Sequence, residues 1–120
     1  MTSETTIVQN IRLALSNGFV RLFRNNVGVL QDREGRYVTY GLCKGSSDLI
    51  GWKSLVITPD MVGKRIAQFI ALEAKSASGK VTDEQRAFIL AVRQAGGRAG
   101  MARSTQEAKE IIGVTEDQHD

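Results

Sequence analysis

Cysteine and long apolar segments are what this sequence has least of. Cys43 is the only cysteine among the 120 residues, which excludes an intrachain disulfide and a zinc cluster built on cysteines. No stretch approaches the roughly 18 apolar residues that a membrane span requires. The first residues also lack the basic-then-apolar order of a secretory signal. We therefore expect a cytoplasmic protein, in a reducing compartment and without membrane association.

Several kinds of site lack the residues they need. His119 is the only histidine and lies among acidic residues, and Cys43 has no histidine near it in the sequence. The glycines at positions 45, 51 and 63 do not form a phosphate-binding loop. No repeat, low-complexity segment or linker divides the chain. We expect one domain over residues 1–113 and an acidic, flexible tail over 114–120.

The net charge of +3 hides an asymmetry along the chain. After Arg103 the only basic residue is Lys109, while the same segment holds five acids, Glu107, Glu110, Glu116, Asp117 and Asp120. The body of the protein therefore carries nearly all the positive charge. Such a body suits a polyanionic partner such as nucleic acid, although a solvated basic face explains the charge equally well.

Apolar periodicity and turn residues predict an α/β protein. Helical spacing appears over 3–17, and two further helices are expected to begin after Thr82 and Ser104. Strands are predicted over 19–26, 48–57, 64–75 and 98–102, with 37–42 as a further short strand or an extended lead-in. The order helix, strands, helix, strand, helix (α-β-β-β-α-β-α) indicates a central mixed sheet flanked by helices.

Two capping boxes and one proline mark the ends of helices. Thr82 with Gln85, and Ser104 with Glu107, have the spacing of a capping box. Thr58 precedes Pro59, which suits the first position of a single helical turn. In the helix after Thr82, one apolar stripe is predicted from five residues, Ala87, Phe88, Ala91, Val92 and Ala95.

The triplet Glu73-Ala74-Lys75 closes the apolar run Phe69-Ile70-Ala71-Leu72. Residues two apart on a strand point to the same side of the sheet, so Glu73 and Lys75 would share a face. The ordinary interpretation is a solvated ion pair worth about 0–1 kcal/mol. The functional interpretation is a strand end that presents an acid and an amine to a divalent metal and an activated water.

Asp48 follows the flexible Gly45-Ser46-Ser47 and opens the strand predicted over 48–57. In an antiparallel pairing of this strand with 64–75, Asp48 would meet Glu73. Two such carboxylates repel unless a cation bridges them or one is protonated. Magnesium or manganese suits this all-oxygen site, completed by a backbone carbonyl and waters. Lys75 would then orient the water and offset charge on a phosphate.

Two further polar residues each have two interpretations. Gln85 lies near the predicted apolar stripe and either caps its helix only or points from the helix end toward a phosphate or water. Glu4 lies three residues before Ile7 and is either a favourable acid in a first helical turn or another metal ligand.

Taken together, these motifs resemble the core of the PD-(D/E)xK nucleases, and more closely the VRR-NUC family with its small stand-alone members from phages. The likeness covers roughly residues 3–112. It is carried by the Glu4 helix, Arg24-Asn25-Asn26-Val27-Gly28, Gly45-Ser46-Ser47-Asp48-Leu49-Ile50-Gly51, Glu73-Ala74-Lys75, Gln85 and Gly97-Arg98-Ala99-Gly100. One departure is Ser47, where the signature often has proline.

The resemblance implies a restriction-endonuclease-like core and Mg²⁺- or Mn²⁺-dependent hydrolysis of DNA. It implies Asp48, Glu73 and the carbonyl of Ala74 as metal ligands, with Glu4 as an outer or additional one. Lys75 would be the water-orienting base, and Gln85 would support the site. The family also implies branched DNA such as Holliday junctions as substrate, a homodimer, and the cytoplasm of a bacterial host if the protein is phage-encoded.

We therefore expect a structure-selective endodeoxyribonuclease. The alternative in another class is a catalytically silent DNA-binding module with the same fold, which would bind phosphates through its basic body. A third reading is a small interaction domain in which Glu73 and Lys75 are surface charges only, and it predicts no affinity for DNA.

Overall fold

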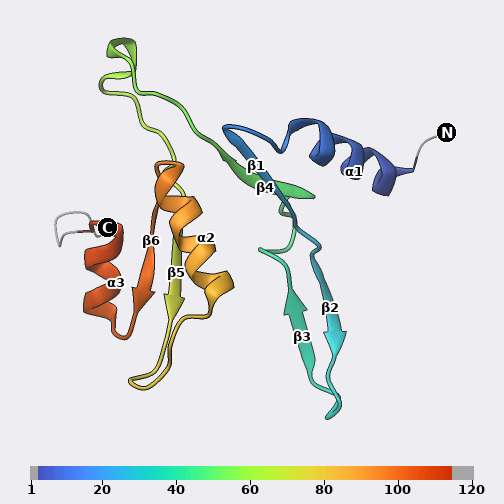
Figure 1. Cartoon of the computed structure of the whole chain (residues 1–120). Coiled ribbons are helices and arrows are strands. Elements are labelled where there is room, and N and C mark those ends of the chain that lie inside the picture. Colours follow the sequence, from blue (N-terminus) through green and yellow to red (C-terminus); the bar gives the residue numbers. More distant parts are fainter. Residues whose placement is uncertain (1–2, 115–120) are drawn as a thin grey trace. The chain divides into compact units, whose positions relative to one another are not determined.

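The computed structural model describes residues 3–114; the tail predicted over 114–120 therefore lies outside these residues from position 115 on. Contacts divide the chain into two compact units, residues 1–55 and 56–120. The strands form antiparallel and parallel pairs, and three α-helices accompany them (Figure 1). The protein is thus of the mixed α/β class that the sequence predicts. None of the helices in the described range has both the length and the apolar composition needed to cross a bilayer.

The first unit consists of one helix and two antiparallel strand pairs. Helix α1 covers Glu4–Leu15, and strand β1, Val20–Arg24, pairs with β4, Leu49–Lys53. In the sequence between β1 and β4, strands β2, Gly28–Gln31, and β3, Tyr37–Tyr40, form an antiparallel hairpin. The hairpin confirms the short strand expected after residue 36, whereas β2 is a strand that the sequence analysis missed.

Asp32 shapes the turn of this hairpin. Its Oδ1 accepts hydrogen bonds from the backbone N–H groups of Glu34 and Arg36, at 3.0 and 2.9 Å, and its Oδ2 lies 2.8 Å from Arg36 Nε. Gly35 takes a φ of +80°, which glycine adopts without steric cost. Residues 32–35, Asp-Arg-Glu-Gly, are turn-forming types, and local side-chain bonds fix the turn here.

The second unit is a parallel strand pair with helices on both faces. Strand β5, Ile70–Ala74, and strand β6, Arg98–Ala102, are parallel, and α2, Asp83–Gln94, connects them. A single 3₁₀ turn, Pro59–Met61, precedes β5, and α3, Thr105–Ile112, follows β6. Figure 1 shows α2 and α3 beside the strand pair.

Side chains of β6 alternate between the two helices. A Cβ built on Gly97 would lie 2.7 Å from Val92 of α2, whereas one built on Gly100 would lie 3.0 Å from Ile111 of α3. Because successive strand residues point to opposite faces, Ala99 faces α2 and Ala102 faces α3. Of the described residues, the buried apolar ones are Ile89, Val92, Ala99 and Ala102, so the core of this unit lies around β6.

Two strand predictions were too long. The strand expected over 64–75 covers only Ile70–Ala74, and the one expected over 48–57 covers only Leu49–Lys53. Each strand is as long as its partner, since β6 and β1 offer five residues each. A strand needs hydrogen bonds to a neighbour, so apolar residues beyond the partner's end do not extend it.

The helix ends largely follow the predicted caps. The capping box of Thr82 and Gln85 is present with both of its hydrogen bonds. At α3 the Ser104 hydroxyl caps Glu107 N–H, but Glu107 Oε1 accepts from Arg103 N–H, at 2.7 Å. The second prediction was therefore right about the helix start and wrong about the reciprocal bond. At the 3₁₀ turn Thr58 is the N-cap residue without a capping side-chain bond.

Candidate active site

Glu73 and Lys75 lie at the carboxyl end of β5 and face α2. In the parallel register Glu73 stands opposite Met101. Met101 lies two residues after Ala99 and therefore shares its face, which is the face toward α2. Lys75 Nζ is 3.6 Å from Glu73 Oε1, and the side chains of Glu73 and Lys75 are 33% and 20% exposed. The shared face predicted for the triplet is thus confirmed. The two groups are more enclosed than a solvated surface pair, so their interaction is less screened by water.

Gln85 of α2 touches this pair directly. Its Nε2 donates to Glu73 Oε1 at 2.8 Å, while its Oε1 accepts from Thr82 N–H at 3.0 Å. A backbone N–H can only donate, so the carbonyl oxygen of the amide must face Thr82 and the NH₂ group must face the carboxylate. Gln85 therefore both caps its helix and holds Glu73, so the interpretation in which it only caps the helix is wrong. That Gln85 points toward a phosphate or water stays a prediction.

The position of Gln85 follows from the true buried stripe of α2. The buried side chains are Ile89 and Val92, four and seven residues after Gln85, and this is helical spacing. Phe88, which the sequence analysis placed on the stripe, is 39% exposed, and Ala87 is exposed as well. The predicted Val92 is thus confirmed as buried, whereas Ile89 takes the place of Phe88 on the stripe. This places Gln85 on the sheet-facing side of the first turn.

The triplet has two further oxygen atoms that could serve as metal ligands, Glu73 Oε2 and the carbonyl oxygen of Ala74. Among the described residues, Glu73 Oε2 has no hydrogen-bond partner, because both contacts of the carboxylate use Oε1. Lys75 N–H donates to Ala102 O and Phe69 O accepts from Arg98 N–H, so odd-numbered residues of β5 direct their backbone groups toward β6. The carbonyl of Ala74 consequently points to the other edge of β5.

Asp48 lies just before β4, where β1 and β4 meet. Its backbone carbonyl accepts from Asn25 N–H at 2.8 Å, which extends the ladder one step beyond the Arg24–Leu49 pair. The residue is exposed, and within residues 3–114 its carboxylate makes no hydrogen bond or ion pair. Asp48 is therefore an accessible acid on a rigid backbone position.

Asn25 is the functional candidate that the sequence analysis did not single out. It was quoted only as part of a family-like segment, yet its side chain reaches 17 to 22 positions along the chain to hold the loop before Asp48. Asn25 lies near the end of the predicted strand 19–26 and directly after the observed β1, and this position offered no local signal, since asparagine is common at strand ends and turns.

The predicted site residues fall into two groups. Glu73, Lys75 and Gln85 are brought together in the second unit, with Ala74 between the first two. Asp48 and Glu4 belong to the first unit. The antiparallel pairing considered for the Asp48 and Glu73 strands was not the right one: β4 pairs with β1 and β5 with β6. That Asp48 converges with Glu73 stays a prediction. Glu4 is the first residue of α1 and exposed, and its role as a ligand stays a prediction too.

The oxygen atoms of the candidate residues are of the type that a hard divalent cation binds. Asp48 and Glu73 offer carboxylate oxygens and Ala74 a carbonyl oxygen, which are the ligands that Mg²⁺ and Mn²⁺ favour. Among the described residues, no group of three or more acidic, histidine or cysteine side chains is close enough together to hold a metal by itself. Within the second unit, a cation would thus be held by Glu73 and the Ala74 carbonyl together with waters.

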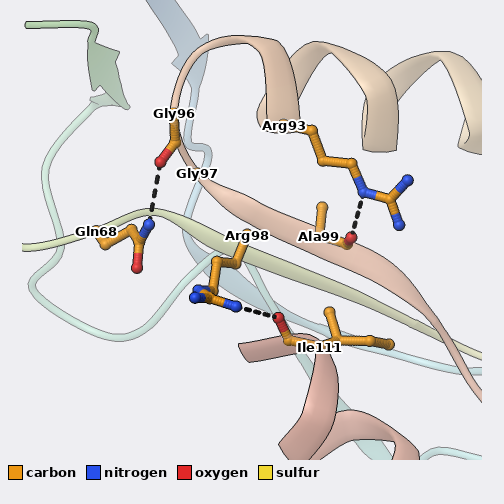
Figure 2. A pocket seen from close by; sticks show the side chains of 7 residues that line it. All are labelled: Gln68, Arg93, Gly96, Gly97, Arg98, Ala99 and Ile111. Atoms are coloured by element: carbon orange, nitrogen blue, oxygen red, sulfur yellow. Dashed lines mark hydrogen bonds between the residues drawn. The ribbon is translucent and has the colours of Figure 1, made fainter. Parts of the chain in front are cut away.

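A hollow of about 400 Å³ in the second unit has a different character (Figure 2). Arg93 Nε donates to Ala99 O at 2.8 Å and Arg98 Nη1 to Ile111 O at 3.3 Å. Both guanidinium groups lie where α2 and α3 end, and positive charge is favourable at the carboxyl ends of helices. These hydrogen bonds give both arginines a structural role.

The mixed α/β fold, with an acid and a lysine two residues apart at a strand end and a helix glutamine bonded to the acid, is consistent with a restriction-endonuclease-like fold. The family model described as VRR-NUC domain matches residues 29–106, more than half of the chain. The chain belongs to the VRR-NUC family, and its function is of the nuclease type, in DNA processing. No match was found among curated proteins or solved structures. The matched range includes Asp48, Glu73, Lys75 and Gln85, whereas Glu4 and Asn25 precede it.

Proposed function

We propose that the protein is a Mg²⁺- or Mn²⁺-dependent structure-selective endodeoxyribonuclease. The observation that carries the proposal is the contact set at the end of β5. One oxygen of Glu73 is held by Gln85 and Lys75, and the other oxygen is left without a partner. A simple surface ion pair does not need a helix-capping amide to fix one oxygen of its acid. For a metal ligand such a bond is useful, because a carboxylate that is already oriented loses less conformational entropy when the cation binds.

Each residue has a defined part in this proposal. Asp48, Glu73 and the carbonyl of Ala74 hold the cation, and Gln85 fixes the Glu73 carboxylate. Lys75 orients the attacking water and, when its amine is neutral, assists the deprotonation of that water. When bound, the cation supplies positive charge beside the phosphodiester and makes a nearby water more acidic. Glu4 serves as an outer or additional ligand from the first turn of α1.

The substrate we propose is branched DNA such as a Holliday junction, cut by a homodimer in the cytoplasm of a bacterial host. The support is the resemblance to small phage members of the family together with the basic body of the chain. A two-fold dimer would place two sites to cut opposite strands of a junction.

The test is cleavage of a labelled four-way junction, a flap and a plain duplex with Mn²⁺ and with Mg²⁺. Asp48→Ala and Lys75→Ala should each lose at least about 100-fold in cleavage rate, since each removes a group placed at the reacting atoms. Matched controls are Asp83→Ala, whose side chain is 98% exposed, and Lys80→Ala in the loop after β5. Cutting at the wild-type rate by both site variants would sink the assignment.

A DNA-binding module without catalysis would give another result. Junction binding would persist in a mobility-shift assay, no strand would be cut with either cation, and calorimetry would show no Mn²⁺ binding that Glu73→Ala removes. A protein that neither binds nor cuts any of the DNAs would be the interaction domain of the third reading.

A further inference from the structure

The side chain of Asn25 spans the loop that leads to Asp48. Its Oδ1 accepts from Leu42 N–H at 2.9 Å, and its Nδ2 donates to Ser46 Oγ at 2.7 Å and to Ser47 O at 2.9 Å. Both N–H donors of the amide and one lone pair are thus used within one loop. An asparagine with three such bonds is fixed in rotamer, in amide orientation and in distance from the loop.

Ser46 continues the same network inside the loop. Its hydroxyl donates to Cys43 O at 2.6 Å and accepts from Cys43 N–H at 3.3 Å, besides accepting from Asn25. Ser46 N–H also bonds to Cys43 O, and Gly45 takes a φ of +85°, so residues 43–46 form a tight turn that needs glycine at its third position. Local bonds therefore fix the backbone of residues 43–46. The Asn25 side chain bonds to the loop at its start, Leu42, and at its end, Ser47.

Asp48 emerges from this loop between two anchors. Asn25 holds the carbonyl of Ser47 through its side chain and the carbonyl of Asp48 through its own backbone N–H. These bonds fix the peptide groups on both sides of the Asp48 Cα, and so set the direction in which its carboxylate leaves the chain. The bond to residue 47 uses only a main-chain carbonyl, so it does not depend on whether serine or proline stands there.

We propose that Asn25 is a positioning residue for Asp48, which rests on the proposed role of Asp48 as a metal ligand. Asn25 does not touch the cation or the DNA. It narrows the directions open to the Asp48 carboxylate, so that less conformational freedom is lost when the cation binds. Its removal should weaken cation binding while the fold of the first unit remains.

The first readout needs neither metal nor DNA. In Asn25→Ala the Leu42 amide loses its acceptor and should exchange with solvent faster, as measured by NMR, while amides within the β2–β3 hairpin keep their protection. Asn26→Ala is the matched control, because the neighbouring exposed Asn26 accepts only from Arg24 Nε, at 3.1 Å, among the described groups. This control should leave Leu42 unchanged.

The second readout is binding of Mn²⁺ alone, measured by calorimetry. Substitution of residues that orient metal ligands typically costs about 10- to 100-fold in affinity, and we expect that loss for Asn25→Ala. Ser46→Ala removes one of the two acceptors of the Asn25 amide and should show a smaller loss in the same direction. Excess Mn²⁺ should restore cleavage by Asn25→Ala but not by Asp48→Ala.

The outcomes separate this inference from the function on which it rests. A wild-type protein that neither binds Mn²⁺ nor cuts DNA refutes the proposed function. A wild-type protein that does both, together with a folded Asn25→Ala that binds Mn²⁺ with unchanged affinity, refutes only the positioning role. Unfolding of both Asn25→Ala and Ser46→Ala would also overturn it, since Asn25 would then be needed for folding rather than for the site.

Discussion

The amide group of Gln85 both caps α2 and holds the Glu73 carboxylate. Different substitutions of Gln85 should therefore affect stability and activity to different degrees. Gln85→Ala removes the 2.8 Å bond to Glu73 Oε1 and the 3.0 Å bond to Thr82 N–H. A hydrogen bond to a charged group contributes about 1.5–3 kcal/mol. We take the lower end because Glu73 is 33% exposed. The lost helix cap adds roughly 0.5 kcal/mol, so the free energy of unfolding should fall by about 2 kcal/mol.

Gln85→Glu distinguishes the two bonds. A carboxylate at this position can still accept from Thr82 N–H, and negative charge is favourable in the first turn of a helix. The contact with Glu73 changes from attraction to repulsion. The cap is therefore kept and only the site is disturbed.

Urea unfolding measures these changes, and a double-mutant cycle with Glu73→Ala isolates the Gln85–Glu73 term. The coupling should be about 1.5 kcal/mol, within the range for residues in one network. Gln106→Ala is the control, because Gln106 is an exposed helix residue whose amide lies 3.5 Å from a glutamate oxygen. A Gln85→Ala variant no less stable than Gln106→Ala, or a coupling near zero, would refute the reasoning.

Two further predictions concern the framework of the second unit. Val92→Ala creates a cavity at a side chain that is 1% exposed, and should lower the free energy of unfolding, measured with urea, by about 1–3 kcal/mol. The control Leu13→Ala changes a side chain that is 68% exposed and should alter this free energy by less than about 0.5 kcal/mol. Equal effects of the two substitutions would contradict the assigned core. Arg103→Ala removes the guanidinium that donates to Ser76 O and Gly79 O, so peptides covering 76–81 should exchange hydrogen faster while α2 does not, and an unchanged rate would exclude this anchor of the loop after Lys75.

Local chemistry explains why many elements were predictable. The caps at Thr82 and Ser104 and the turn at Asp32 depend on hydrogen bonds between residues two to four positions apart. Such bonds are nearly independent of the rest of the fold. The Glu73 and Lys75 pair is predictable for the same reason, because a strand alone places residues two apart on one face.

The buried side of α2 was not determined locally. Residues 87–92, Ala-Phe-Ile-Leu-Ala-Val, are apolar without interruption, so several stripes fit the helical period equally well. Packing of α2 against β6 and against Gly97, which directly precedes β6, selects the stripe through Ile89 and Val92. Only this choice turns Gln85 toward Glu73.

Strand partners were likewise a matter of the tertiary structure. An apolar run shows that a segment is extended, but its partner comes from contacts between residues far apart in sequence, such as β1 with β4 and β5 with β6. The partner also sets the length, and for this reason the strand predicted from residue 64 begins only at Ile70.

The sequence by itself pointed to Asp48, Glu73, Lys75 and Gln85 as site candidates, and to the strand end or helix start at which each one lies, because residue type and short-range spacing are properties of the chain. The tertiary structure decided which side chains meet. Packing of α2 against β5 and β6 brought the Gln85 amide to Glu73, and closure of the loop before β4 brought the Asn25 amide to the backbone beside Asp48. Both contacts join residues at least 12 positions apart, and no local pattern fixes contacts at such separations.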